Sequence, residues 1–206
     1  MLLDIQFTIA AILLILALLP LYIYRKRIIS KFKESDSFPL FVQDIKAHMS
    51  AYHPKIKINY SIIDRTKDKN DPVLREALII ENIVEQFFDY PYERKTQNPV
   101  AKEKLWVNYI EKSPSNPKYP SDWIQRKELA WSRDNRCCNR CAQELSLDNT
   151  FTSFVKDISE GGSYSLENII ILCADCNKVI NSTNPRNTIS SLPLNDKLLF
   201  FAQDRH

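Results

Sequence analysis

The chain has 206 residues, a formal net charge of +3 and 44% hydrophobic residues. This length allows one or two small domains, and the mildly negative mean hydropathy excludes a multi-span transporter. A charged fraction of 26% with 11% aromatic residues excludes a wholly disordered chain, while a charge of +3 is too small to identify a nucleic-acid binder.

The first predicted element is a charge-free segment over 5–24. A helix of about twenty such residues spans about 30 Å, the thickness of a bilayer core. Basic residues follow at 25–27 and only Asp4 is charged before the segment. The positive-inside rule then predicts a single-pass protein of the inner or plasma membrane, with its N-terminus outside and its bulk cytoplasmic. A cleaved signal peptide and a buried core helix are the alternatives, which the flanking charges and the uniformly apolar surface disfavour.

After a basic juxtamembrane linker over 25–37, residues 38–112 are predicted to form a small α+β region. Its expected elements are a helix over 38–52, a half-buried strand over 56–62, a helix from Pro72 to about Asp89 capped by Asn70 or Asp71, and a shorter helical stretch after Pro99. A linker over 113–118 follows. His48 and His53 are five residues apart, which is not the spacing that places two ligands on one helix face. We therefore expect no catalytic site in this region.

The strongest signal is a pair of CxxC motifs, Cys138 to Cys141 and Cys173 to Cys176. Two such motifs give four thiolates about 2.3 Å from one zinc ion in a closed, structural site. Two disulfides are the alternative, which a reducing cytoplasm disfavours. The fifth cysteine, Cys137, is either a small packed hydrophobe or a spare ligand.

The sequence around these motifs carries a family resemblance. The relevant elements are Tyr119-Pro-Ser-Asp-Trp123, Arg126, Trp131, Arg133-Asp134, Ser159-x-Gly161-Gly162 and Glu167-Asn168, together with the two CxxC motifs. In this order they resemble the zinc-containing branch of the HNH endonuclease family over residues 119–182. The resemblance implies a ββα-metal fold: a helix over 121–133, a strand over 151–158, a glycine turn, a second strand over 168–172, and a final helix that begins at the second CxxC motif.

The resemblance also implies where catalytic residues should lie, and this chain departs from it there. Family members carry a metal ligand and a general-base histidine at the positions of Ser153 and Phe154, and a metal-binding histidine at the position of Asn177. Phenylalanine cannot accept a proton, and serine alone is a poor metal ligand. Asn168 matches the family asparagine that supports the loop. We therefore expect no nuclease activity by the family's mechanism.

The overall prediction is an α+β protein with an N-terminal transmembrane helix and a C-terminal zinc-stabilised HNH-like module. The tail over 183–206 is expected to add a short helix capped by Asn195. The module is predicted to bind DNA or RNA without catalysis, or to act as a scaffold for other protein subunits. One alternative is an active membrane-tethered endonuclease with a rearranged site. The other is a structural subunit of a membrane complex. The basic residues predicted to contact nucleic acid are Arg126, Lys127, Arg133, Arg136 and Arg140.

Overall fold

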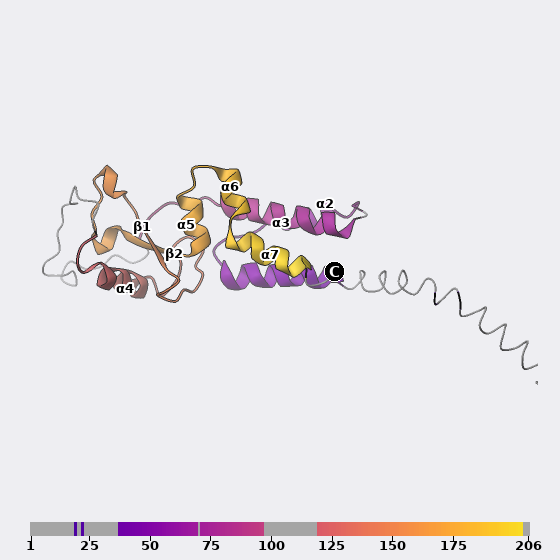
Figure 1. Cartoon of the computed structure of the whole chain (residues 1–206), viewed down its shortest axis with the longest axis horizontal. Helices are drawn as coiled ribbons and strands as arrows, with labels where there is room; N and C mark the ends of the chain where they lie inside the picture. Colours follow the sequence, from indigo (N-terminus) through magenta and orange to yellow (C-terminus); the bar gives the residue numbers. More distant parts are fainter. Residues whose placement is uncertain (1–18, 20–21, 23–36, 70, 97–118, 204–206) are drawn as a thin grey trace, which may run out of the picture. The chain divides into compact units, whose positions relative to one another are not determined.

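The computed structural model describes residues 19, 22, 37–69, 71–96 and 119–203, and the chain divides into two compact units, 1–43 and 44–206. A helix over 37–52 runs into the second unit, which holds all the elements named below (Figure 1). In chain order they are α2 (Ile62–Arg65), α3 (Pro72–Asp89), α4 (Trp123–Arg133), β1 (Phe151–Phe154), β2 (Ile169–Leu172), α5 (Ala174–Ile180), α6 (Pro185–Ser190) and α7 (Pro193–Gln203). Two short 3₁₀ helices, η2 (Ile158–Glu160) and η3 (Leu166–Asn168), lie between the strands.

The predicted fold class included a transmembrane helix, and the structure contradicts this part of the prediction. Across the described part of the chain, no helix is long and apolar enough to cross a bilayer, which contradicts the predicted single-pass localisation. A span needs about 20 predominantly apolar residues, whereas the 18 residues of α3 include five charged ones. The segment 5–24 lies outside the described residues except for Leu19 and Tyr22, and so does nearly all of the linker over 25–37.

The helix predicted from Pro72 to Asp89 is confirmed at both ends. Asp71 caps it, because its carboxylate accepts hydrogen bonds from the backbone N–H groups of Val73 and Leu74 at 3.0 and 3.4 Å. Proline occupies the first helical position, where its missing N–H costs nothing. The apolar face of α3 is buried and forms much of the core, namely Ile79, Ile80, Ile83, Val84 and Phe87.

The strand predicted over 56–62 is wrong. This segment contains no strand, and its last residue begins α2. The carboxamide of Gln86, on α3, accepts from the backbone N–H of Asn59 at 2.7 Å and donates to its carbonyl oxygen at 3.0 Å. A side chain therefore satisfies the backbone groups that a neighbouring strand would have paired. The predicted helical stretch after Pro99 and the linker over 113–118 lie outside the described residues.

The C-terminal elements follow the predicted order. β1 and β2 pair antiparallel, with Phe151 opposite Leu172 and Phe154 opposite Ile169; α4 packs on β2 and α5 on β1 (Figure 1). Three boundaries differ from the prediction. The first helix begins at Trp123 rather than at 121, β1 ends at Phe154 rather than at 158, and β2 begins at Ile169 rather than at 168.

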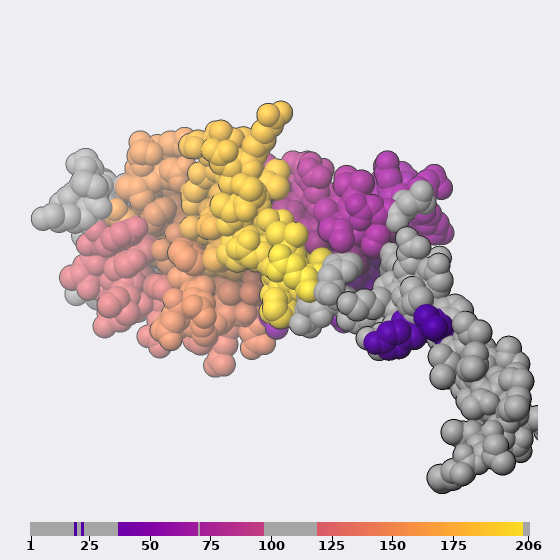
Figure 2. All heavy atoms as spheres, turned by 45° about the vertical axis from the view of Figure 1, so that its right-hand side comes forward, coloured from indigo at the N-terminus to yellow at the C-terminus, as the bar shows by residue number. Residues whose placement is uncertain are grey.

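The tail holds two helices instead of one. α6 is capped by Asn184, whose side chain accepts from the backbone N–H of Asn187 at 3.4 Å, and Pro185 opens it. α7 begins at Pro193, so Asn195 lies in its first turn and is not its cap. α6 and α7 both contact α3, and Figure 2 shows them, in yellow, against its magenta surface. The tail therefore belongs to the same packed unit as the cysteines.

Candidate metal centre

The first CxxC motif lies in a tight loop after α4. The backbone N–H of Cys138 donates to the carbonyl of Gln143 at 2.8 Å, and that of Ala142 donates to the carbonyl of Cys138 at 2.9 Å. Ala142 has a φ of 63°, in the left-handed region that non-glycine residues rarely occupy. This fold of the backbone turns the side chains of Cys138 and Cys141 towards the same buried point.

The second CxxC motif opens α5. Cys173 is the N-cap of the helix, and its sulfur accepts from the backbone N–H of Cys176 at 3.4 Å. Both cysteines are buried. Because α5 follows β2 directly, the strand pair fixes where these two sulfurs lie relative to the first loop; the backbone N–H of Asn139 in that loop also donates to the carbonyl of Ile171 in β2, at 2.8 Å.

The four sulfurs form one cluster. They lie within 4.8 Å of one another, all four residues are buried, and the Cys141 and Cys173 sulfurs are 3.7 Å apart. Four sulfurs about 2.3 Å from a zinc ion in tetrahedral geometry would be about 3.8 Å apart, so the cluster fits one zinc ion. The four cysteines predicted as zinc ligands thus lie close enough together to bind one zinc ion. Cys137 is outside the cluster and only partly buried, and its thiol donates to the carbonyl of Asn135 at 3.3 Å.

The thiols influence one another's ionisation. Burial opposes a charge on Cys138, but hydrogen bonds from the other three thiols outweigh it and hold the pKa of Cys138 well below its usual range. Burial raises the pKa of Cys176 well above its usual range, and the hydrogen bond with Cys138 raises the pKa of Cys141 and of Cys173. One thiolate is favoured and its neighbours hold protons, which a metal ion would have to displace to bind all four sulfurs.

The two positions at which the sequence resemblance implies a metal ligand and a base, Ser153 and Phe154, hold packing residues. Ser153 is 7% exposed and pairs with Ile170 in the strand ladder. The Phe154 ring lies 5.9 Å from that of Trp123 and 5.7 Å from that of Tyr164, measured between centroids. The Phe154 side chain is thus part of an aromatic cluster with Trp123 and Tyr164.

Neighbouring polar residues are also engaged in structural contacts. Asn177 accepts a hydrogen bond at its side-chain oxygen from the amide of Asn181, at 3.0 Å. The carboxylate of Asp157 forms an ion pair with Arg94 at 3.1 Å. Asn168, the retained family asparagine, accepts from the backbone N–H of Lys156 at 2.8 Å and donates to the carbonyls of Lys156 and Ser163 at 2.9 and 2.7 Å. Asn168 therefore closes the loop between the strands, next to the backbone bond that the Val155 N–H donates to the Asn168 carbonyl at 2.9 Å.

Three of the five basic residues predicted to contact nucleic acid are turned inward. Arg126 is 4% exposed, donates to the carbonyl of Tyr164 at 2.7 Å and pairs with Asp122. The side chain of Arg133 is 7% exposed and pairs with Asp134 at 2.8 Å. Arg140 is 2% exposed. The sequence left open whether the five basic residues form a continuous surface patch, and these three arginines are too deeply buried to belong to one.

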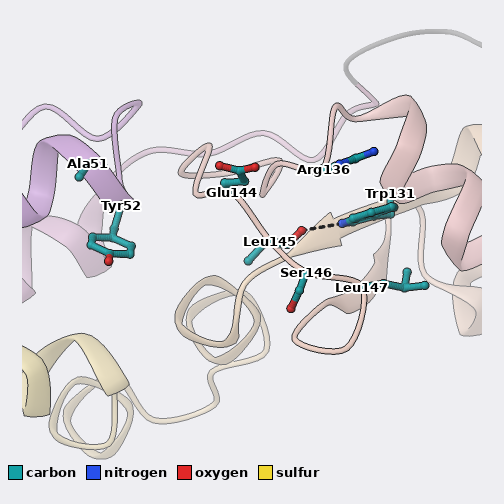
Figure 3. A pocket seen from close by; sticks show the side chains of 8 residues that line it. All are labelled: Ala51, Tyr52, Trp131, Arg136, Glu144, Leu145, Ser146 and Leu147. Atoms are coloured by element: carbon teal, nitrogen blue, oxygen red, sulfur yellow. Dashed lines mark hydrogen bonds between the residues drawn. The ribbon is translucent and has the colours of Figure 1, made fainter.

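Of the other two, Lys127 is half-buried and Arg136 is exposed. The guanidinium of Arg136 lies over the ring of Trp131, 5.0 Å from its centroid, and the Trp131 indole N–H donates to the carbonyl of Leu145 at 2.8 Å. Arg136 and Trp131 line an open groove of about 560 Å³, with Tyr52 on its other side and Glu144 and Ser146 between them (Figure 3). The Tyr52 side chain is 48% exposed.

Two structural roles were missed by the sequence prediction. Arg140 donates to the sulfur of Cys176 at 3.6 Å, and its place inside the first CxxC motif is the sequence feature that could have indicated this role. Arg94 neutralises Asp157 from a segment far away in the chain, for which the sequence offers no signal.

Comparisons with known proteins agree with the geometry of the metal centre. Residues 138–183 match the family model described as HNH endonuclease. The match covers the four cysteines, both strands and α5. No curated protein and no solved structure matches the chain. The chain therefore contains an HNH-like region with a four-cysteine site that can bind zinc.

Proposed function

We propose that residues 119–203 form a zinc-stabilised HNH-like module that binds nucleic acid without cleaving it. We infer the absence of catalysis mainly from the packing of Phe154 against Trp123 and Tyr164. A general base must reach a water molecule and accept its proton, and a phenyl ring can do neither. Four thiolate ligands also leave no open position on the ion at which water could be activated.

The nucleic-acid part of the proposal is supported by the family match and by the groove of Tyr52, Trp131 and Arg136. Unpaired bases stack on aromatic rings and on arginine, because every base has a flat face. In this groove Tyr52 is exposed, and Arg136 lies over the half-buried ring of Trp131. The carboxylate of Glu144, in the same groove, would repel the phosphate groups of a nucleic acid. Stacking, rather than a broad positive field, is therefore the expected mode of contact.

The test of nucleic-acid binding uses the full-length protein and a fluorescent single-stranded oligonucleotide. Tyr52→Ala should weaken binding by about 1–3 kcal/mol, the usual contribution of one stacked base. Arg136→Gln should reduce the slope of the logarithm of the binding constant against the logarithm of the salt concentration by about one. Arg186→Gln, an exposed arginine on α6 outside the groove, is the matched control and should leave binding unchanged. If no binding is detected at low salt, the proposal fails.

A scaffold for protein subunits is the second candidate. It is favoured by the burial of Arg126, Arg133 and Arg140 and by the near balance of charge over 119–203, which holds nine Lys and Arg against ten Asp and Glu. If the protein binds one zinc ion per chain but neither cleaves nor binds nucleic acid, the scaffold is the candidate that remains.

The alternative of an active endonuclease requires a rearranged site. Asp157 is the carboxylate nearest the missing pair in sequence, and Arg94 neutralises it. We expect no metal-dependent nicking of plasmid DNA by the full-length protein. Nicking that Asp157→Ala abolishes would overturn the proposal.

A further inference from the structure

The guanidinium of Arg140, in the first CxxC loop, is one of the deeply buried charges in the described residues. The residue is 2% exposed and has one of the largest fully buried side chains. A buried cation destabilises a fold unless its hydrogen bonds and its charge are both satisfied. The partners of Arg140 therefore indicate what the residue does.

On one side the partners are the carbonyl groups at the end of α3. Nη2 donates to the backbone oxygens of Phe87, Phe88 and Tyr90, at 2.5, 3.2 and 3.2 Å. The guanidinium also lies over the Phe87 ring, 4.9 Å from its centroid. The last carbonyls of a helix have no partners within the helix and favour a cation. The last turn of α3 has no basic residue of its own, so Arg140 supplies the missing charge from a distant part of the chain.

On the other side the partner is the cysteine cluster. Nη1 donates to the sulfur of Cys176 at 3.6 Å. Four thiolates around a divalent ion keep a surplus of negative charge, and in a buried site with a low dielectric this surplus needs a counter-ion. A hydrogen bond to a ligating sulfur also fixes the direction in which that sulfur presents its lone pairs.

We propose that Arg140 is a positioning residue that links zinc binding to the folded end of α3. One guanidinium bridges Cys176 and the three carbonyls, so each side stabilises the geometry that the other needs. The linkage reaches beyond the HNH match at 138–183, because α3 precedes that match by about fifty residues. It does not depend on nucleic-acid binding.

Replacing Arg140 by Met removes the charge and the hydrogen bonds but keeps an unbranched side chain. Substitutions beside metal ligands usually weaken metal affinity by about 10–100-fold, and we expect a loss in this range for Arg140→Met, measured by competition with a chromogenic chelator. Arg186→Met is the control, because it removes an equal charge from an exposed position on α6. A zinc affinity of Arg140→Met within about threefold of that of the control would overturn the proposal.

A second measurement decides the question even if Arg140→Met does not fold. Hydrogen exchange of the amides at 86–89 is compared between zinc-loaded and zinc-stripped wild-type protein. We expect faster exchange in this last turn of α3 once zinc is removed, because the guanidinium loses its fixed position. If these amides exchange equally slowly in both forms, zinc and α3 are not linked.

Discussion

Replacing Asn168 by Ala should lower the free energy of unfolding of the zinc-loaded protein by about 2 kcal/mol. Its side chain makes three hydrogen bonds to the backbone of Lys156 and Ser163. Each such bond contributes about 0.5–1.5 kcal/mol net. The groups of Lys156 are exposed and can bond to water in the variant, whereas the carbonyl of Ser163 is partly buried, so the lower half of the summed range applies. Zinc content should not change, because Asn168 contacts no sulfur.

The assay is urea unfolding at saturating zinc, with Asn149→Ala as the control in the exposed loop before β1. Asn168→Asp separates the bonds: it keeps the acceptor for the Lys156 N–H but loses the two donated bonds. Its second carboxylate oxygen would face the carbonyls of Lys156 and Ser163 in place of the donating amide, so Asn168→Asp should be at least as destabilised as Asn168→Ala. A loss for Asn168→Ala no larger than that of the control would refute the idea that this asparagine closes the loop.

Three further predictions concern the turn, the buried histidine and the metal. Gly162→Ala should cost about 3 kcal/mol, because its Cβ would lie 2.0 Å from the carbonyl oxygen of Lys156. Gly161→Ala should cost only about 1 kcal/mol, because its φ is 87° but its Cβ would meet only the Nζ of Lys156, at an ordinary contact distance of 3.7 Å. Urea unfolding distinguishes the two variants. Burial lowers the pKa of His53 to about 4 from its usual 6.5. Between these two pH values the unfolded chain binds more protons than the folded chain, so the free energy of unfolding should fall by up to about 3 kcal/mol as the pH drops from 6.5 to 4. His53→Phe should remove this part of the pH dependence in unfolding curves recorded across the range, and an unchanged pH dependence would contradict the prediction. Cys141→Ser should release the zinc ion, seen by metal analysis, and should lower the melting temperature to that of the chelator-treated wild type; a variant that retains one zinc ion per chain would count against the four-cysteine site.

The parts of the fold that were predictable from the sequence depend on local signals. The helix from Pro72 to Asp89 has a cap, a proline at its first position and a regular apolar face, all within its own segment. The cysteine cluster follows in the same way from the two CxxC spacings. These signals need no knowledge of distant residues, and the structure agrees with them.

Two of the predictions that failed concern groups whose partners are distant in sequence. The alternation over 56–62 resembles a strand, but the Gln86 carboxamide pairs with the backbone of Asn59 from α3. Arg126 and Arg140 read as surface charges on a helix and a loop. Their partners, the carbonyls of Tyr164 and Phe87, lie 38 and 53 residues away, and composition does not reveal that packing.

The buried carboxylate of Asp175 has a practical consequence for cutting the chain. Asp175 lies between the last two cysteines, is 7% exposed and accepts from the backbone N–H of Leu194 at 2.9 Å, in the first turn of α7. A fragment that ends with the family match at 183 would leave this acceptor without its donor beside the cysteines, and would expose the faces of α3 that α6 and α7 cover. The sequence motif and the smallest piece that folds therefore have different boundaries. Expression trials should extend to 203 at least, even when only the cysteines are of interest.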